Sequence, residues 1–176
     1  MSATHLIPIS EYLNTAYRPD VDYVEGELQE RNLGERDHGK LQLYFAVLFA
    51  NNSRIWKLDV IPELRVQVRE DRFRVPDICI LAANAPREQI VRTPPVLCIE
   101  ILSPADTIRG MRERVRDFLG MGVREVWLVD PATRSVILCA GNIMTEQTEG
   151  ALVLEGTLIS IPIAEAFRVL DELPGS

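Results

Sequence analysis

The sequence PPVLCIEILSPAD, residues 94–106, is an apolar run that is interrupted by a single charged residue, Glu100. A short apolar run of this kind, with prolines at both ends, is typical of a strand that is buried on both faces of a sheet. The residues at 103–106 predict a turn into a helix, with Asp106 as its N-cap. We therefore expect a central strand that leads directly into a helix.

The helix expected after residue 106 is amphipathic. At about 100° per residue, the apolar side chains fall on one face, and they are those of Ile108, Met111, Val115, Phe118 and Leu119. Another apolar run, EVWLVD at 125–130, follows and predicts a second buried strand. A helix that links two buried strands indicates a mixed β-sheet core flanked by helices. The predicted fold class is therefore α/β (α+β).

Further elements are expected on both sides of this segment. Apolar spacing and turn residues predict helices over about 10–17, 37–52 and 164–170, and strands over 21–30, 64–68, 75–81, 135–139, 151–154 and 157–161. Asp37 is expected to cap the second of these helices. Because no linker or repeat divides the chain, we predict one domain over 1–176, in which 141–176 supplies C-terminal strands and a helix.

Composition limits the classes of function. The chain has 176 residues, of which 47% are hydrophobic, and a formal net charge of -7. This charge argues against a protein that coats polyanions, but it permits a local basic patch or an acidic metal pocket. Three cysteines without a CxxC pair indicate buried thiols in a reducing, cytoplasmic compartment. No signal peptide and no membrane-spanning run are recognisable, so we expect no membrane association.

Two carboxylates, Asp77 and Glu100, lie in runs that are otherwise suited to a sheet interior. A buried ionised carboxylate is costly unless it is paired or binds a metal. Two strands of one sheet could bring both groups to one Mg²⁺ ion, which prefers oxygen ligands and keeps several waters. The alternative is that Asp77 caps a turn after Pro76 and that Glu100 pairs with an arginine, and the spacing of the two residues leaves both interpretations open.

Several blocks of the sequence together resemble the Uma-type family of predicted restriction endonucleases, within the PD-(D/E)XK nuclease superfamily. The blocks occur in order over about residues 8–140, and they are RPDVDYVEGELQER at 18–31, GERDHGKL at 34–41, VPDICIL at 75–81, PPVLCIEILSPAD at 94–106 and MGVREVWLVDP at 121–131. The resemblance implies a restriction-endonuclease-like mixed sheet and a phosphodiesterase site that uses Mg²⁺, or Mn²⁺ in its place.

The resemblance also implies roles for individual residues. Asp77 matches the first acid of the motif and Glu100 the second, so both are expected to bind the metal and to be catalytic. His38 matches a histidine of the family and is expected to be catalytic, the alternative being a surface residue near the start of a helix. Glu27 matches an acidic position and is expected to be a third metal ligand, the alternative being an exposed charge on a hairpin. The superfamily lysine is absent, because Leu102 stands two residues after the second acid.

Arg114 replaces the lysine that Uma-type sequences often supply from the helix, four residues before an aromatic residue, here Phe118. On the helical wheel Arg114 lies at one margin of the apolar stripe, from which its side chain can reach the sheet. An arginine can stabilise a phosphate transition state, but it cannot deprotonate a water molecule.

Two functions follow from these residues. The first is a Mg²⁺-dependent endonuclease that hydrolyses DNA phosphodiester bonds; the second is a catalytically inactive nuclease-like fold that binds nucleic acid or a protein. DNA is the expected partner, and a homodimer would provide two sites for cutting both strands. Two groups of arginines are candidates for contact with the phosphate backbone, namely Arg109, Arg112, Arg114 and Arg116, and Arg65, Arg69, Arg72 and Arg74.

Overall fold

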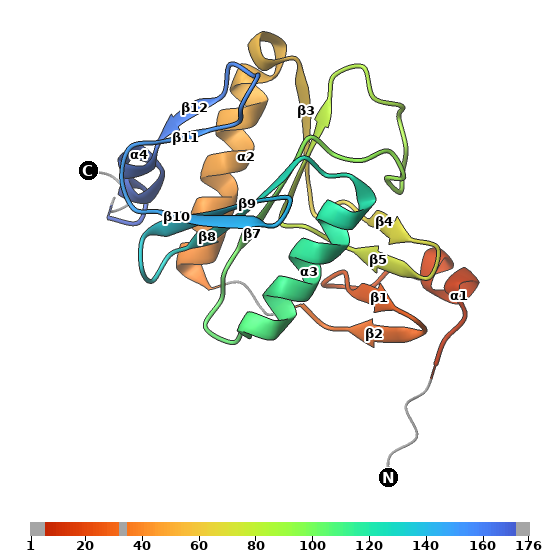
Figure 1. Cartoon of the computed structure of the whole chain (residues 1–176). Helices are drawn as coiled ribbons and strands as arrows, with labels where there is room; N and C mark the ends of the chain where they lie inside the picture. The colour runs from red at the N-terminus through yellow and green to blue at the C-terminus, as the bar shows by residue number, and fades with distance from the viewer. Residues whose placement is uncertain (1–5, 32–34, 172–176) are drawn as a thin grey trace.

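A six-stranded mixed sheet forms the centre of the computed structural model, which describes residues 6–31 and 35–171 (Figure 1). Its strand order is β10-β9-β8-β7-β6-β3, and only β7 and β8 are parallel. Its strands are β3 (Leu58–Pro62), β6 (Ile78–Ala82), β7 (Leu97–Ile101), β8 (Glu125–Asp130), β9 (Ser135–Ala140) and β10 (Ile143–Gln147). The mixed sheet predicted from the sequence is thereby confirmed.

Three of the four helices in the described part of the chain cover the faces of this sheet, and α1 (Ile9–Asn14) packs on a smaller sheet instead. The three are α2 (Arg36–Trp56), α3 (Ile108–Met121) and α4 (Ile163–Arg168). Helices α2 and α4 pack on one face, and α3 packs on the other (Figure 1). Since β7 and β8 are parallel, the chain must cross over between them, and α3 is that crossover.

Successive side chains of β7 point to opposite faces of the sheet. Leu97, Ile99 and Ile101 join the core below α2, and Cys98 joins the core below α3. Every residue of β7 is buried, which explains why its sequence is continuously apolar. By the same alternation, Glu100 points to the face that α3 covers.

Two smaller sheets complete the fold. An antiparallel sheet of order β2-β1-β5-β4 consists of β1 (Asp22–Val24), β2 (Glu27–Gln29), β4 (Val66–Arg69) and β5 (Arg72–Arg74). Strands β11 (Ala151–Val153) and β12 (Ser160–Pro162) form an antiparallel pair whose apolar residues extend the core on the α2 side. The first of these sheets lies next to α3 and carries part of the candidate site.

Three details at the helix ends differ from the sequence prediction. Thr107, not Asp106, is the N-cap of α3, because its hydroxyl accepts from the Gly110 amide at 3.1 Å. Asp106 instead closes the preceding turn by accepting from the Ser103 amide at 2.7 Å. Helix α2 continues to Trp56 and does not end near Asn52. The Asn52 side-chain amide donates to the Leu48 carbonyl at 2.9 Å, within the helix. Its N-cap is Glu35, and Asp37 lies in its first turn.

The cysteines agree with the prediction of buried thiols: Cys79, Cys98 and Cys139 are all free and buried. Within the described part of the chain, no helix has both the length and the apolar character needed to cross a bilayer.

Candidate active site

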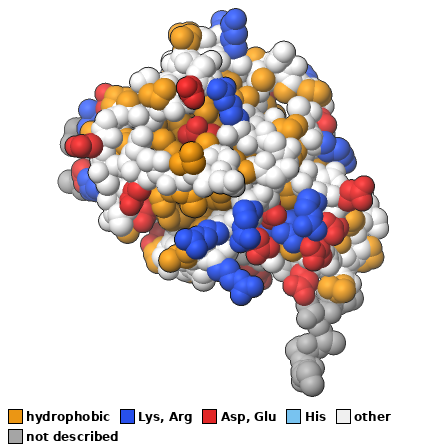
Figure 2. Space-filling view, in the orientation of Figure 1, with side chains coloured by type: hydrophobic (Ala, Val, Ile, Leu, Met, Phe, Trp, Pro, Cys, Tyr) orange, Lys and Arg blue, Asp and Glu red, His pale blue; other side chains and the backbone are white. Residues whose placement is uncertain are grey.

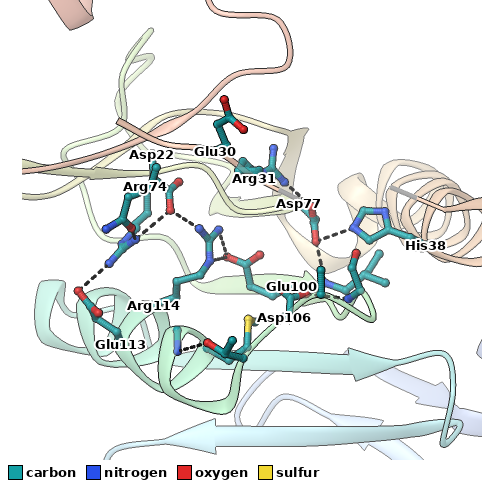
Figure 3. A pocket seen from close by; sticks show the side chains of 17 residues that line it. Asp22, Glu30, Arg31, His38, Arg74, Asp77, Glu100, Asp106, Glu113 and Arg114 are labelled. Carbon is teal, nitrogen blue, oxygen red and sulfur yellow. Dashed lines mark hydrogen bonds and ion pairs between the residues drawn. The ribbon is translucent and has the colours of Figure 1, made fainter. Parts of the chain in front are cut away.

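Asp77 and Glu100 meet because of the register between β6 and β7. Ile78 pairs with Ile99 in this antiparallel ladder, so the residue before Ile78 faces the residue after Ile99. Both carboxylates line a pocket of about 190 Å³ between the central sheet, α3 and the β1–β5 sheet. We call this the carboxylate pocket (Figure 3). The two buried carboxylates are therefore brought to one place, as expected for strands of one sheet.

Asp77 is 3% exposed and accepts three interactions. Its Oδ2 atom accepts from the Ile101 amide at 2.7 Å and lies 3.2 Å from His38 Nε2, and its Oδ1 atom accepts from Arg31. Burial by itself would raise the pKa of Asp77, but the hydrogen bond with His38, the charge of Arg31 and the Ile101 amide together lower it below its usual value. Asp77 is therefore ionised at neutral pH.

Glu100 is held by a single partner. Its Oε1 atom accepts from Arg114 Nη2 at 2.6 Å and from Nε at 3.1 Å. Its Oε2 atom has no hydrogen-bond partner among the residues that the structure describes. Burial raises the pKa of Glu100 to about 7, although the charge of Arg114 opposes this shift. A positive charge close to Oε2 would therefore stabilise the ionised form of Glu100.

Arg114 bridges two carboxylates, as Figure 3 shows. Besides Glu100, its guanidinium binds Asp22 through Nη1, and Nη2 donates to the Val75 carbonyl at 3.0 Å. The side chain therefore reaches from α3 to the sheet, as its place on the helical wheel predicted. Burial would lower the pKa of Arg114, but Asp22 and Glu100 raise it further, so the group remains a cation.

Asp22 is a third buried carboxylate in the pocket, and the sequence interpretation did not select it. It is 1% exposed, and its Oδ1 atom accepts from the Val75 amide at 2.9 Å. Glu27, which was expected to be the third metal ligand, is exposed in β2 and is not among the residues that line the pocket. The β1–β2 hairpin explains the difference, because the chain reverses at Glu25 and Gly26, which have φ of 52° and 97°, and strand alternation does not continue through such a turn. In the structure all three residues of β1 are buried, and this burial distinguishes Asp22 from the exposed Glu27.

His38 lies in the first turns of α2, and its side chain is 11% exposed. Its hydrogen bond with Asp77 raises the pKa of His38 above its usual value, and burial opposes this effect in part. The structure thus brings four predicted site residues together, namely Asp77, Glu100, Arg114 and His38. Their catalytic and metal-binding roles stay predictions.

An ion network supports the pocket from the side of the small sheet. Arg74 is 2% exposed, and it donates to Asp22 at 3.0 Å through Nη1 and to Asp117 at 2.7 Å through Nε. Arg72 donates to Asp117 and Glu25 at 2.9 and 2.7 Å. These pairs tie β1 and β5 to α3, and they hold Asp22 against Arg114.

This network changes the interpretation of the arginine-rich segments. Arg72 and Arg74 are buried in ion pairs, and Arg65 pairs with Asp20 at 2.6 Å, so these side chains do not form a basic surface for DNA. On α3, the Arg114 side chain lies in the carboxylate pocket, whereas Arg109, Arg112 and Arg116 are exposed. In Figure 2, basic side chains gather over α3. The α3 surface is the better candidate for contact with a phosphate backbone.

The donor set of the carboxylate pocket fits a hard divalent cation. Glu100 has one carboxylate oxygen without a partner among the described residues, and ionised Asp77 lies across the ladder from it. No group of three or more His, Cys, Asp or Glu side chains suited to a metal occurs among residues 6–31 and 35–171. Mg²⁺ is commonly held by one or two carboxylates and several waters, so a two-carboxylate site is sufficient for it.

Comparisons with known proteins agree with this arrangement. The model of the Uma2 family, described as "Putative restriction endonuclease", matches residues 9–165. The crystal structure of a "putative nuclease belonging to DUF820" from Anabaena variabilis superposes with a TM-score of 0.83 and 21% sequence identity, covering 93% of this chain and 99% of that chain. This likeness establishes a shared fold and confirms the predicted fold class.

A cryo-electron microscopy structure of a DrdV–DNA complex gives a TM-score of 0.44 and 14% identity, covering 78% of this chain and 11% of that chain. This similarity is too low to support an inference. No curated protein matches the chain.

Proposed function

The chain belongs to the Uma2 family, described as "Putative restriction endonuclease", and from this premise we propose that it is a Mg²⁺-dependent endonuclease that hydrolyses DNA phosphodiester bonds. One observation carries the proposal: the buried carboxylates of Asp77 and Glu100 face each other across β6 and β7, beside the buried guanidinium of Arg114. Mn²⁺ would serve in place of Mg²⁺. A cytoplasmic protein with DNA as its partner, acting as a homodimer that cuts both strands, fits this function.

Asp77 and Glu100 would hold the metal, with Glu100 binding through its free Oε2 atom. A bound divalent cation supplies a water of lowered pKa and neutralises charge on the phosphate. Asp77 is ready for this role at neutral pH because its pKa is lowered. Glu100 would become fully ionised when a cation compensates its burial.

Arg114 supplies a fixed positive charge beside the phosphate. Its Nη1 and Nη2 atoms are held by Asp22 and the Val75 carbonyl, so the guanidinium has one orientation before substrate arrives. Such a preorganised cation stabilises the charge of the transition state. It does not accept a proton, whereas His38 lines the same pocket and is a type of side chain that can exchange one near neutral pH.

Plasmid nicking tests this function. Purified protein with Mg²⁺ or Mn²⁺ should convert supercoiled plasmid to the open circle, and Asp77→Asn should abolish the conversion. The Asp59→Asn variant, which changes an exposed aspartate in β3, is the matched control and should nick at the normal rate. Equal nicking by Asp77→Asn and the unmodified protein would exclude this pocket as the active site.

A second candidate function is a catalytically inactive nuclease-like fold that binds nucleic acid or a protein. The specific observation in its favour is that both oxygens of Asp77 and one oxygen of Glu100 already have protein partners. Thermal unfolding separates the two functions. If millimolar Mg²⁺ raises the melting temperature of the unmodified protein but not that of Glu100→Gln, the result supports the endonuclease. Absence of both this shift and nicking supports the inactive fold.

A further inference from the structure

A second, larger pocket adjoins the carboxylate pocket. It has a volume of about 530 Å³ and lies between the starts of α2 and α3, the end of β8, and strands β9 and β10. We call it the apolar pocket, because much of its lining is apolar, including Leu102, Pro104, Ile108, Leu128, Ile137 and Met144. Its volume is within the range of sites that bind small organic groups.

The two pockets share one wall. His38, Ser103, Asp106, Thr107 and Met111 line both of them. A ligand that places a phosphate against Asp77 and Glu100 can therefore extend along residues 103–107 into the apolar pocket. This continuity indicates that both pockets serve one substrate.

Charge decides which part of a nucleotide can enter the apolar pocket. Four carboxylates belong to its lining, those of Glu35, Asp37, Asp106 and Asp130. These groups repel a phosphate, but they accept hydrogen bonds from the amino groups of a nucleobase. Arg112 lines the pocket on the α3 side, next to the exposed Arg109 and Arg116. Figure 2 shows hydrophobic side chains beside the basic side chains that lie over α3.

We propose that the apolar pocket receives the nucleobase next to the scissile phosphate, in an unstacked conformation, while the backbone follows the arginines of α3. The proposal rests on the proposed function and names its substrate class, which is DNA that is single-stranded or locally unpaired at the point of cleavage, as supercoiled plasmid is where its strands separate. A base inside an intact duplex cannot enter such a pocket, because it is stacked and paired. Single-stranded sites combine a basic track with side chains that contact the faces of the bases, which are aromatic in those sites and aliphatic among the apolar lining residues of this pocket.

Binding in EDTA tests this proposal without cleavage. Affinities are measured by fluorescence anisotropy for a labelled single strand, for the same sequence as a duplex, and for a single strand of abasic nucleotides. The intact single strand should bind about tenfold more tightly than the abasic strand, and the duplex should bind like the abasic strand.

Two substitutions locate the contact. Ile108 is 75% exposed and Met144 is 46% exposed, so Ile108→Ser and Met144→Ser should leave the fold intact. Each should weaken single-strand binding about fivefold and leave the affinity for the abasic strand unchanged. Leu158→Ser is the matched control, because Leu158 is 70% exposed and does not line the pocket. Its affinity should equal that of the unmodified protein.

Four outcomes are decisive. Equal affinity for the intact and abasic strands overturns the proposal. A change of oligomeric state in Ile108→Ser, seen by analytical ultracentrifugation without any change in single-strand affinity, also overturns it and assigns the pocket to a second copy of the chain. If plasmid nicking depends on Asp77 but the base preference is missing, the proposed base pocket is wrong and the proposed nuclease activity stands. If the base preference depends on Ile108 but nicking is missing, the proposed hydrolysis is wrong and the base pocket stands.

Discussion

At the scale of single residues, Arg114 distinguishes this chain from the lysine pattern that its sequence resembles. A guanidinium presents several donors in a plane, so it can hold Glu100, Asp22 and a backbone carbonyl together. A lysine ammonium is a more flexible point charge and would not satisfy these partners in the same geometry. The replacement of lysine by arginine therefore stabilises the folded carboxylate pocket, and it removes a group that could transfer a proton.

Arg114→Lys should separate these two effects. We expect the free energy of unfolding to fall by about 2 kcal/mol, because one buried carboxylate loses a charged partner. We also expect faster Mg²⁺-dependent nicking, since a lysine keeps a positive charge beside the phosphate and adds a group that can transfer a proton. Urea denaturation and the plasmid assay measure the two quantities, and Arg116→Lys on the exposed face of α3 is the control. Slower nicking would mean that the guanidinium itself is required.

Two raised pKa values make the metal-free protein sensitive to pH. The pKa of Glu100 is raised by burial to about 7, and that of His38 is raised by its hydrogen bond with Asp77. In both cases the folded state binds the proton more strongly than the unfolded state, so stability is lost as the pH rises through the folded pKa. We expect the melting temperature in EDTA to be about 5 °C lower at pH 8 than at pH 6.

Calorimetry measures this difference, and the variants Glu100→Gln and His38→Asn should each reduce it. A melting temperature that is constant or increases from pH 6 to pH 8 would contradict the assignment of these two groups.

At the scale of elements, α3 both covers the sheet and supplies charge to the site. Its apolar face, with Met111, Val115 and Phe118, packs on the sheet between the Thr107 cap and the left-handed Gly122 at its C-terminus. Beside this stripe, Arg114 points to the carboxylate pocket, while Glu113 and Asp117 contact the arginines of β5. The helix is thereby fixed to two sheets.

Arg74 is the link between α3 and the small sheet, and its removal should be costly. Arg74→Met leaves Asp22 and Asp117 without one of their charged partners in a buried site, so we expect a loss of about 3–5 kcal/mol in the free energy of unfolding. Arg69 is 53% exposed, so Arg69→Met should lose less than about 1 kcal/mol. Urea denaturation of both variants checks the contrast, and similar losses for both would show that the Arg74 network does not support the fold.

At the scale of the whole molecule, the central sheet has one apolar core on each face. The α2 side contains the aromatic residues Phe45, Phe49 and Trp127, whereas the α3 side contains all three cysteines. The carboxylate pocket lies at the edge of the core on the α3 side, where the β1–β5 sheet meets α3. The site therefore depends on the packing of both sheets against α3.

The reactivity of the three thiols measures how accessible the core on the α3 side is to reagents. Burial raises the pKa of Cys139 to about 11 and that of Cys98 well above its usual value, and all three thiols are buried. We expect no labelling of the native protein by Ellman's reagent at pH 8 over one hour, because the reaction needs an accessible thiolate. Three thiols should react in concentrated urea, and rapid labelling without denaturant would show that the core opens.

Much of the central architecture could be predicted from local pattern. The apolar runs at β6, β7 and β8 and the helical stripe of α3 are strong signals, because burial on both faces and a 3.6-residue period leave few alternatives. The N-cap of α3 was missed by one residue, since Asp106 and Thr107 are both capping residues and the choice depends on the path of the preceding turn.

The sequence by itself determined that Glu100 lies in a buried strand, that Asp77 lies at the start of another, and that Arg114 lies at the edge of an apolar helix face, because periodicity follows from the backbone geometry of strands and helices. Only the tertiary structure decided that Asp22, and not Glu27, joins them, that Arg72 and Arg74 are buried in ion pairs, and that an apolar pocket adjoins the carboxylates. These features depend on the turn of the β1–β2 hairpin and on contacts between residues far apart in the chain. Local sequence pattern can indicate the turn at Glu25 and Gly26, but it does not contain the contacts between distant residues.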